Sequence, residues 1–578
     1  MKFRELAKYF ERLEATTKRL EMTEILAELF KNPQINKDEV DKIIYLCQGQ
    51  LLPVFKDVVF GISEKILHKA IIDSSSYTSE KITDLFQKLG DYGEVAQELC
   101  KGHKQSQGIN DVHQKLMDIA LASGAGAVTK KVSLLSRLIK DLSSVEAKYA
   151  IRIILGRLRL GVGDPTVLDS LSLAKQGDKA LRRKLERAYN LCSDLGLVAK
   201  ILFSKGIRYI DEFKVIVGCP IRVALAARLP NPQEIIDKIG PCAVEAKYDG
   251  FRCQVHKDGQ QVRIFSRNLE DTTHMFPEIK DAVAEKIKQK KVVFEGEALA
   301  YDTSTGKCLP FQVTVQRKRK YDIEQMQRRF PLKLFVFDIL YTDSDGDLAQ
   351  VTYKKRRQIM SQVISDGQVL QKSPFKIVKT AEELTKIFED ALAEGREGII
   401  AKRLEAGYQA GGRNFNWIKL KRTYEDRLSD TIDCVIVGYY FGKGQRASFG
   451  IGSLLGCVYD KNNNQFKTVA KIGSGLSEDQ LIKLKKILDK IKLKEKPKNV
   501  DSELEPDIWV TPKFVVEVQA DEITRSPVHT CGKIKDKKAG FALRFPRAVN
   551  FIRTDKDAQD ATSVAEVINM FKLQGRKS

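Results

Sequence analysis

The chain has 578 residues, which at about 150 residues per domain corresponds to three or four domains and excludes a single small binding module. Lysine and arginine number 98 and aspartate and glutamate 76, so the formal net charge is +22, and a polyanionic partner is favoured, either nucleic acid or an anionic membrane surface. Hydrophobic residues make up 43% of the chain, which excludes a disordered polycation.

The first about 205 residues have the periodicity of helices. One apolar stripe at helical spacing is formed by Phe3, Leu6, Ala7, Phe10 and Leu13. The segment GVGDPT at 161–166 invites comparison with a glycine-rich nucleotide loop, but it completes neither GxGxxG nor GxxxxGKS/T, so a helix-connecting turn is favoured. Basic runs at 130–140 and 181–187 favour a surface that follows phosphates. We expect an all-α N-terminal domain over residues 1–208.

From GCPIRVALAARLPNP at 218–232 onward, short runs with the period of β-strands take over. The runs 251–256 and 261–265 flank Asp258-Gly259, which is a strong hairpin signal. Further strands are expected at 291–302, 331–341, 398–404 and 415–421, and a helix is expected over 381–395. This mixture predicts an α+β domain over residues 209–428.

A third pattern begins near Ser429. The runs TIDCVIVGYYFG, GSLLGCVYD and QFKTVAKIG have the character of short strands separated by polar turns, and a final helix is expected over 564–574. These features suggest a small β-barrel, and the OB-fold is the commonest such barrel that binds nucleic acid. We therefore predict a multidomain chain that ends in an all-β OB-fold domain over residues 429–578.

The ten cysteines are scattered, and no two are closer than eleven residues. This spacing excludes CxxC zinc sites and redox pairs and predicts reduced thiols in the cytoplasm, near the nucleoid if the source is prokaryotic. No run of the about 18–20 apolar residues that cross a bilayer occurs, and acidic residues stand at the N-terminus where a signal peptide would lack them. Only six histidines occur, so a metal here would be held by carboxylates and phosphates, which points to Mg²⁺ or Mn²⁺.

The most informative segment is VEAKYDGFR at 244–252. If it is a strand that enters a turn, its period of two puts Glu245 and Lys247 on one face and Val244 and Ala246 toward the core. Asp249-Gly250 then supplies the turn. Taken alone, this pattern also fits a lysine on a solvated surface.

Other strands repeat charged or aromatic residues on a single face. The sets are Glu295 and Glu297, Phe335 and Phe337, and Trp417 with Lys419 and Lys421. Gly296 between the two glutamates permits close backbone approach, and Glu397 precedes the strand at 398. Periodicity alone also fits core aromatics at the two phenylalanines. Together, carboxylates, cations and aromatics in one domain suggest a pocket for a nucleoside triphosphate and its metal.

Seven short motifs now carry a resemblance. They are K-Y-D-G at 247–250, S-R-N at 266–268, E-G-E at 295–297, F-V-F-D at 335–338, E-G-I-I-A-K at 397–402, W-I-K-L-K at 417–421 and R-F-P-R at 544–547. In this order they resemble the motif set of the covalent nucleotidyltransferases. Over essentially its whole length the chain is similar to ATP-dependent DNA ligases of the archaeal and eukaryotic replicative type. The segment 158–171 resembles that family's DNA-binding domain and the segment 439–460 its OB domain.

The resemblance implies an enzyme that seals nicks in duplex DNA with ATP and Mg²⁺ or Mn²⁺, in replication, repair and recombination. Lys247 would attack the α-phosphate of ATP, release pyrophosphate and hold AMP as a phosphoramidate. The adenylate would pass to a 5′-phosphate, and the 3′-hydroxyl would then displace AMP. The nucleophile must be a neutral amine, and an ordinary lysine has a pKa of about 10.4. A bound cation, neighbouring positive charge and partial burial would favour the neutral form.

The resemblance also implies roles around the nucleotide. Glu245 would contact the adenine edge, and Phe337 would stack on the base. Arg252 and Arg267 would hold the ribose and phosphates, and Arg267 would also engage the 5′-phosphate at the nick. Glu297 and Glu397 would carry the ribose hydroxyls and Mg²⁺.

Further cations would act on the phosphates. The α-phosphate would be neutralised by Arg413, Lys419 and Lys421. The leaving pyrophosphate would be oriented by Arg544 and Arg547, which implies a mobile OB domain. Many relatives carry Asp-Gly-Glu where this chain has Glu295-Gly296-Glu297, so no role follows for Glu295.

Two alternatives stay open at this point. An RNA ligase or a capping-type guanylyltransferase would share the chemistry, although the helical domain argues against both. A non-catalytic protein that clamps DNA would use the basic surface alone. The expected partner is nicked duplex DNA, with a sliding clamp as a further candidate, and we expect a monomer that does not bind membranes.

Overall fold

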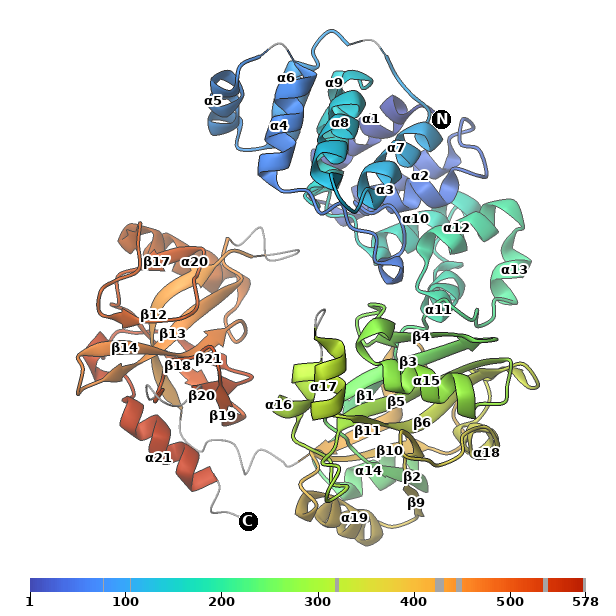
Figure 1. The fold of residues 1–578 in the computed structure, drawn as a ribbon, viewed down its shortest axis with the longest axis vertical. Coiled ribbons are helices and arrows are strands. Elements are labelled where there is room, and N and C mark those ends of the chain that lie inside the picture. Colours follow the sequence, from blue (N-terminus) through green and yellow to red (C-terminus); the bar gives the residue numbers. More distant parts are fainter. Residues whose placement is uncertain are drawn as a thin grey trace. The chain divides into compact units, whose positions relative to one another are not determined.

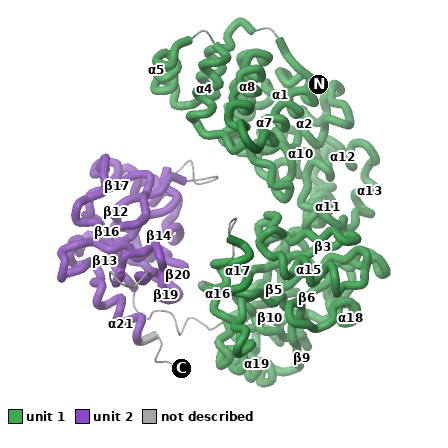
Figure 2. The backbone as a smooth tube through the Cα atoms, in the orientation of Figure 1, with its two compact units in different colours: residues 1–421 green, residues 422–578 purple. Residues whose placement is uncertain are grey.

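The computed structural model describes residues 1–75, 77–103, 105–317, 322–421, 431–442, 450–533 and 539–574. It divides into two compact units, residues 1–421 and 422–578 (Figures 1 and 2). The boundary expected at 428 and residues 443–449 of the motif at 439–460 lie outside the described residues.

Residues 1–211 of the first unit are helical, as the sequence predicts. The helices are α1 (Phe3–Glu14), α2 (Arg19–Lys31), α3 (Val40–Cys47), α4 (Glu64–Ser74), α5 (Ser79–Leu89), α6 (Tyr92–Leu99), α7 (Ile109–Leu121), α8 (Ala127–Lys140), α9 (Ser144–Ile154), α10 (Asp164–Gln176), α11 (Arg182–Cys192), α12 (Leu195–Ser204) and α13 (Ile207–Asp211). All five residues of the apolar stripe in α1 are buried. Helix α10 begins at Asp164, with proline in its first turn, so GVGDPT is a connection between helices, as expected.

A network of ion pairs ties three of these helices together. The Arg152 guanidinium of α9 donates to Glu14 of α1 at 2.8 Å and to Asp91 and Glu94 at 3.0 Å each. Lys148, one turn earlier on α9, pairs with the same two glutamates. Both basic side chains are buried, so the charges hold the helix packing in place.

The rest of the first unit is built on two sheets. The strands are β1 (Leu225–Arg228), β2 (Cys242–Ala246), β3 (Phe251–Asp258), β4 (Gln261–Ser266), β5 (Lys291–Ala300), β6 (Leu332–Thr342), β7 (Gly346–Asp347), β8 (Leu370–Lys372), β9 (Phe375–Val378), β10 (Gly398–Arg403) and β11 (Arg413–Lys421). The helices are α14 (Pro232–Ile239), α15 (Pro277–Lys286), α16 (Phe311–Thr314), α17 (Ile323–Arg329), α18 (Tyr353–Val363) and α19 (Ala381–Ala393). Figure 1 shows this region below the helical part. The α+β class, the hairpin and the long strands are confirmed.

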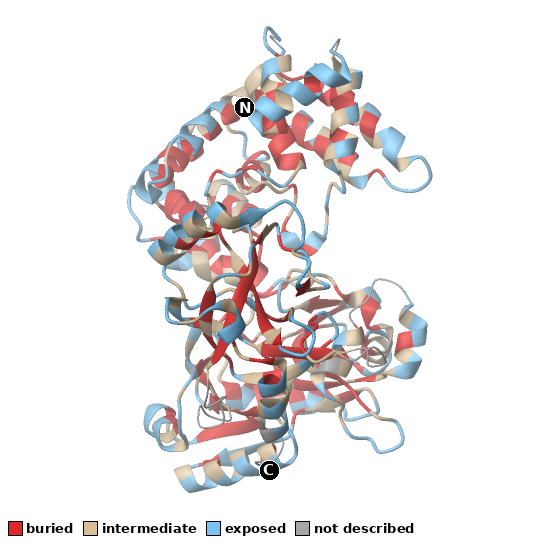
Figure 3. Cartoon of the chain, turned by 90° about the vertical axis from the view of Figure 1, so that its left-hand side faces the viewer, coloured by how far each residue is buried: buried red, intermediate tan, exposed pale blue. Residues whose placement is uncertain are grey.

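One face of each sheet packs against helices. The first sheet has the order β1-β11-β10-β2-β9, and Val244, Ile418 and Leu420 on one of its faces form a core with α14 and α19. The second has the order β4-β3-β5-β6-β7, with β8 beside β6, and α15 and α18 contribute to its core. The strands are largely buried (Figure 3). Along each strand, every second side chain points away from the core that the helices cover. These side chains can form a site between the sheets.

The second unit is the β-rich OB-type domain that the sequence predicts. Its strands are β12 (Ile432–Tyr440), β13 (Ser453–Asp460), β14 (Gln465–Ile472), β15 (Lys492–Leu493), β16 (Val500–Asp501), β17 (Ile508–Val510), β18 (Val515–Gln519), β19 (Glu522–Ser526), β20 (Gly540–Arg544) and β21 (Arg547–Arg553). The helix α21 (Val564–Gln574) is the one expected, whereas α20 (Glu478–Leu488) was not expected from the sequence. A single apolar core joins both helices to the strands.

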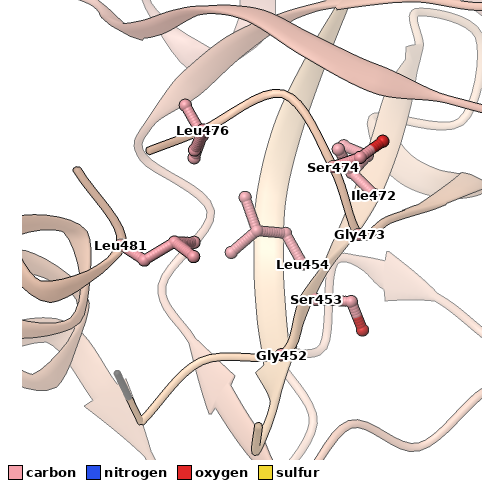
Figure 4. A pocket seen from close by; sticks show the side chains of 8 residues that line it. All are labelled: Gly452, Ser453, Leu454, Ile472, Gly473, Ser474, Leu476 and Leu481. Carbon is pink, nitrogen blue, oxygen red and sulfur yellow. The ribbon is translucent and has the colours of Figure 1, made fainter. Parts of the chain in front are cut away.

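A small hollow lies beside α20 in this unit (Figure 4). It is lined by Gly452, Ser453, Leu454, Ile472, Gly473, Ser474, Leu476 and Leu481. The lining is mainly glycine and aliphatic side chains, and its polar side chains are the hydroxyls of Ser453 and Ser474.

The cysteines agree with the expectation of reduced thiols. All ten are free, eight are buried, and Cys219 and Cys308 are partly exposed. Among the described helices, none is both long enough and apolar enough to cross a membrane.

Candidate active site

Lys247 lies where β2 ends, beside the start of β10. Its backbone N–H donates to the carbonyl of Gly398 at 2.8 Å. Its ammonium pairs with one carboxylate oxygen of Glu397, and the other oxygen pairs with Lys421 of β11. The Lys247 side chain is 20% exposed, so it is accessible yet partly removed from water. The structure thus brings together three residues that the sequence singled out in three separate motifs.

A glycine makes this arrangement possible. Gly398 has φ +144°, and a Cβ there would collide with the carbonyl oxygen of Leu420 and come within 2.9 Å of the Lys421 Cα. Because glycine lacks the Cβ, β10 can start this close to β11. The close approach holds Glu397 between the two lysines.

Positive charge accumulates next to this carboxylate. Lys419 lies on β11 opposite Ile400 of β10 and beside Arg228 of β1. Burial lowers the pKa of Lys419, and the positive charges of Arg413, Lys247, Arg228 and Arg267 lower it further. Cations that destabilise one another in this way are stabilised when an anion binds among them. The arrangement suits phosphate groups.

Arg228 was not found from the sequence. It ends the four-residue strand β1, which pairs in parallel with β11 almost two hundred residues later. The available signal was a basic residue just before the turn LPNP, which by itself is not specific. Only the strand pairing places it among the other cations.

Glu297 of β5 lies near the turn that follows Lys247. The backbone N–H of Gly250 donates to its carboxylate at 3.2 Å. Burial raises the pKa of Glu297 to about 7, against the opposing charges of Arg252 and Lys247. A carboxylate that is costly to ionise when alone is stabilised by a bound cation.

The donor set limits how a metal could bind. Among the described residues, no group of three or more His, Cys, Asp or Glu side chains is arranged to hold a metal ion. Mg²⁺ is commonly bound by one or two carboxylates together with substrate phosphates. The two glutamates near Lys247 fit that mode and do not fit a cage made of protein ligands alone.

Phe337 is placed by an irregularity in β6. Glu295 pairs with Asp338 and Gly296 with Val336, so Phe337 is the extra residue of a β-bulge. Its ring meets Trp417 edge to face, with centroids 5.9 Å apart and an angle of 83°. Phe337 is only partly buried, so it can cover a flat ligand. Phe335 instead is buried and stacks on Tyr248 at 4.5 Å.

Glu245 is buried beneath these aromatics. Its carboxylate accepts hydrogen bonds from Tyr353, from Ser373 at 3.1 Å and from Lys402 at 3.0 Å. Lys402 is also buried, and its ammonium lies 4.5 Å from the Trp417 ring centroid and 4.8 Å from that of Phe337. Burial lowers the pKa of Lys402, and Glu245 opposes this change. The adenine contact expected for Glu245 stays a prediction.

Lys402 had no role in the sequence-based interpretation, although it ends the motif EGIIAK. Its partner Glu245 lies more than 150 residues earlier, and strand alternation indicates only a face, so sequence alone could not pair them. The two residues occupy adjacent strands, β2 and β10, of the same sheet.

Arg252 of β3 lies between the sheets. It donates to Glu295 at 2.7 Å and to the carbonyl of Ala224 at 2.9 Å, and its guanidinium lies 5.4 Å from the Phe337 ring centroid. Its Nε–H is buried and has no hydrogen-bond partner among the described residues. That donor is available for a ligand oxygen. Glu295, which had no role in the sequence-based interpretation, is fully buried and holds this arginine.

Arg544 and Arg547 belong to the second unit. They flank the turn at Phe545, which has φ +51°, between β20 and β21. Arg544 donates to Glu522 of β19 at 2.7 Å. Their action on pyrophosphate stays a prediction.

Comparisons with known proteins agree with this geometry. Family models match residues 2–172 (DNA ligase N terminus), 223–421 (ATP dependent DNA ligase domain) and 447–556 (ATP dependent DNA ligase C terminal region). A "Probable DNA ligase" of Dictyoglomus turgidum is 50% identical over 577 residues, covering 100% of this chain and 98% of that protein. A "DNA ligase" of Sulfolobus acidocaldarius is 39% identical over 596 residues, covering 100% and 99%.

The fold has a counterpart among solved structures. The structure titled "Pmar-Lig_Pre." matches with a TM-score of 0.54 and 18% sequence identity, covering 95% of this chain and 99% of that chain. At this level of identity the match concerns the fold alone.

Proposed function

Because the chain belongs to the family of ATP-dependent DNA ligases, we propose that Lys247 is the residue that carries the adenylate during nick sealing. The family reaction joins a 5′-phosphate to a 3′-hydroxyl in duplex DNA through an adenylate intermediate and uses ATP as substrate. The observation that carries the proposal is the pairing of Lys247 with Glu397 beside a cluster of cations.

In the first step the amine of Lys247 attacks the α-phosphate, and pyrophosphate leaves. The ion pair with Glu397 stabilises the ammonium, so Lys247 releases its proton to water more readily, and becomes the neutral amine, when Glu397 pairs with another cation. Lys419 and the neighbouring arginines act in the same direction, since positive charge nearby disfavours the ammonium.

The cationic cluster stabilises the charge that develops on phosphate. Arg413, Lys419 and Lys421 are proposed to contact the α-phosphate, and Arg267 the 5′-phosphate of the nick in the second step. We add Arg228 to this set because its charge acts on Lys419. In the third step the 3′-hydroxyl displaces AMP, and the same cations stabilise the transition state.

Glu297 and Glu397 would hold Mg²⁺ jointly with phosphate oxygens. When bound, the ion would neutralise phosphate charge and favour departure of pyrophosphate. The raised pKa of Glu297 and the absence of a complete protein cage among the described residues fit a site that forms together with the nucleotide.

The nucleoside is proposed to bind against the ring of Phe337. Phe337 would stack on adenine, Arg252 would hold the ribose and phosphates through its buried Nε–H, and Glu245 would face the adenine edge. Lys402 would hold the Glu245 carboxylate in its orientation through their hydrogen bond.

We propose domains at 1–208, 209–428 and 429–578, with the first and last contacting nicked duplex DNA. Arg544 and Arg547 would orient pyrophosphate during the first step. Because one chain carries the whole motif set, a monomer is proposed, with a sliding clamp as a candidate partner. The enzyme would act where the DNA lies, in the cytoplasm or nucleoid, and would serve replication, repair and recombination.

Mass spectrometry of the protein after incubation with ATP and Mg²⁺ tests the proposal. We expect one AMP adduct, mapped to Lys247, and its loss on addition of nicked DNA. Lys247→Ala should form no adduct and still bind nicked DNA. An adduct that survives this substitution would refute the assignment. Parallel assays with GTP and with nicked RNA distinguish a guanylyltransferase or RNA ligase.

A further inference from the structure

The segment 215–224, here called the strap, connects α13 to β1 and contacts the helical region on one side. The Ser193 hydroxyl donates to the carbonyl of Pro220 at 2.6 Å. The Arg222 N–H donates to the carbonyl of Asn190 at 2.8 Å, and its guanidinium pairs with Asp164 at 3.0 Å. The strap is thus fastened to α10, to α11 and to the residue that follows α11.

On the other side, alternate residues of β3 hold the strap. Gln254 accepts from the Ile221 N–H at 2.6 Å and donates to the Ile221 carbonyl at 2.9 Å. His256 Nδ1 accepts from the Gly218 N–H at 3.0 Å, so its Nε2 carries the hydrogen that Gln254 accepts at 2.9 Å. Burial and the charge of Arg263 lower the pKa of His256 to about 3, so this tautomer stays neutral.

The same network continues to the nucleotide site. Gln254 donates to one oxygen of Glu295 at 3.1 Å. The other oxygen accepts from Arg252 at 2.7 Å and from Tyr408 at 2.8 Å. Burial raises the pKa of Tyr408, so its hydroxyl remains a donor.

The strap also contacts these residues directly through the backbone of one residue, Ala224. The Ala224 N–H donates to the Tyr408 oxygen at 2.8 Å, and the Ala224 carbonyl accepts from Arg252 at 2.9 Å. Glu295, Gln254, His256 and Tyr408 are all buried. Buried polar networks of this kind are rigid because a broken bond leaves an unsatisfied group.

We propose that Glu295 is a positioning residue, which fixes Arg252 for the nucleotide and couples it to the strap. The guanidinium of Arg252 has anchors on two sides, Glu295 and the Ala224 carbonyl, which leave its Nε–H for the ligand. Nucleotide binding at Arg252 therefore stabilises the hydrogen bonds that hold the strap. Because coupling between two sites is reciprocal, intact strap hydrogen bonds also improve nucleotide binding. This inference rests on the nucleotide-binding role proposed for Arg252.

Kinetics of adenylate formation provide the first test. Glu295→Gln keeps the shape and removes the charge, and we expect the KM for ATP to rise at least about tenfold while kcat changes less than about threefold. Glu278→Gln is the matched control, because Glu278 forms another largely buried pair, with Arg317, outside the network. It should reduce the melting temperature without changing KM. An unchanged KM in Glu295→Gln would overturn the inference.

Arg252→Ala separates this inference from the proposed function. If Arg252→Ala raises KM and Glu295→Gln does not, only the positioning role fails. If Arg252→Ala leaves KM unchanged, the nucleotide-binding role of Arg252 fails as well.

Hydrogen exchange tests the coupling in the full-length wild-type protein and in one variant of it. The amides of Gly218, Ile221 and Ala224 should exchange more slowly after Lys247 is adenylated. Gln254→Leu should abolish this protection at Gly218 and Ile221, because it removes the link to the strap. Equal exchange rates in the free and adenylated wild-type protein would overturn the coupling.

Discussion

The carboxylate of Glu397 pairs with the ammonium of Lys247, the residue proposed to carry AMP. This pair opposes the chemistry in the free enzyme, because a neighbouring carboxylate stabilises the protonated lysine. We expect Glu397→Gln to make Lys247 react faster with an amine-specific acylating reagent at a fixed mildly alkaline pH.

The same substitution should slow adenylate formation by at least about tenfold, since a ligand proposed for Mg²⁺ is lost. Peptide mapping of the acylated lysine and a quenched-flow assay of adenylation measure the two effects. Glu389→Gln, on the exposed face of α19, is the control. If Lys247 acylation is no faster in Glu397→Gln, the ion pair has no protective effect.

Phe337 is expected to contribute mainly to nucleotide affinity. Aromatic stacking on a base contributes about 1–3 kcal/mol, so Phe337→Ala should raise the KM for ATP by a factor between about 5 and about 150. Phe86→Ala in the helical region removes a comparable ring, which stacks on Tyr92, and should leave that KM unchanged. An unchanged KM in Phe337→Ala would show that the base binds elsewhere.

Strand alternation predicted much of this site, because the period of two assigns each residue to a face. It placed Glu245 with Lys247, and Trp417 with Lys419 and Lys421, and the opposite residues Val244, Ile418 and Leu420 are indeed core. The hairpin at Asp258-Gly259 was predictable because Gly259 adopts φ +61° at the turn.

Other features depend on which strands become neighbours, and a single sequence does not carry that information. Arg228 joins the cations only because β1 pairs with β11. Glu295 and Tyr408 are more than a hundred residues apart and meet only in the folded chain. The bulge at Phe337 is likewise a property of the pairing between β5 and β6.

Salt should separate DNA binding from adenylation. Lys130, Arg137 and Lys140 of α8 are exposed, and contacts of exposed cations to DNA phosphates weaken steeply as salt rises. Between about 50 and 200 mM salt we expect affinity for nicked DNA to fall at least about a hundredfold, while the rate of adenylation changes less than about threefold. Fluorescence anisotropy measures the affinity for nicked DNA, and a single-turnover assay measures the rate of adenylation. If both fall in parallel with salt, one set of cations serves both DNA binding and adenylation.

Acid should weaken the helical region through Glu14. Burial alone would raise the pKa of this carboxyl, but hydrogen bonds from Arg152, Tyr149 and Lys148 outweigh it and lower the pKa from 4.5 to about 2. A lowered pKa stabilises the folded state above the unfolded value, and this stabilisation is lost as the pH falls from 4.5 to about 2.

Glu14 is about one-third exposed, so screening reduces its contribution to about 1–2 kcal/mol. The free energy of unfolding of Glu14→Gln should be lower by this amount at neutral pH, and it should decline less steeply than that of the wild type as the pH falls. Denaturant titrations of both proteins between pH 7 and pH 3 provide the measurement. Identical pH profiles would show that the ion network does not stabilise the fold.

The distribution of thiols makes the strap observable by spectroscopy. Eight cysteines are buried, and of the two that are partly exposed, Cys219 lies in the strap and Cys308 follows β5. Burial raises the pKa of Cys219, so a maleimide dye should react there faster at mildly alkaline pH. After Cys308→Ser, a single fluorophore on the natural Cys219 would report strap movement in real time during each turnover.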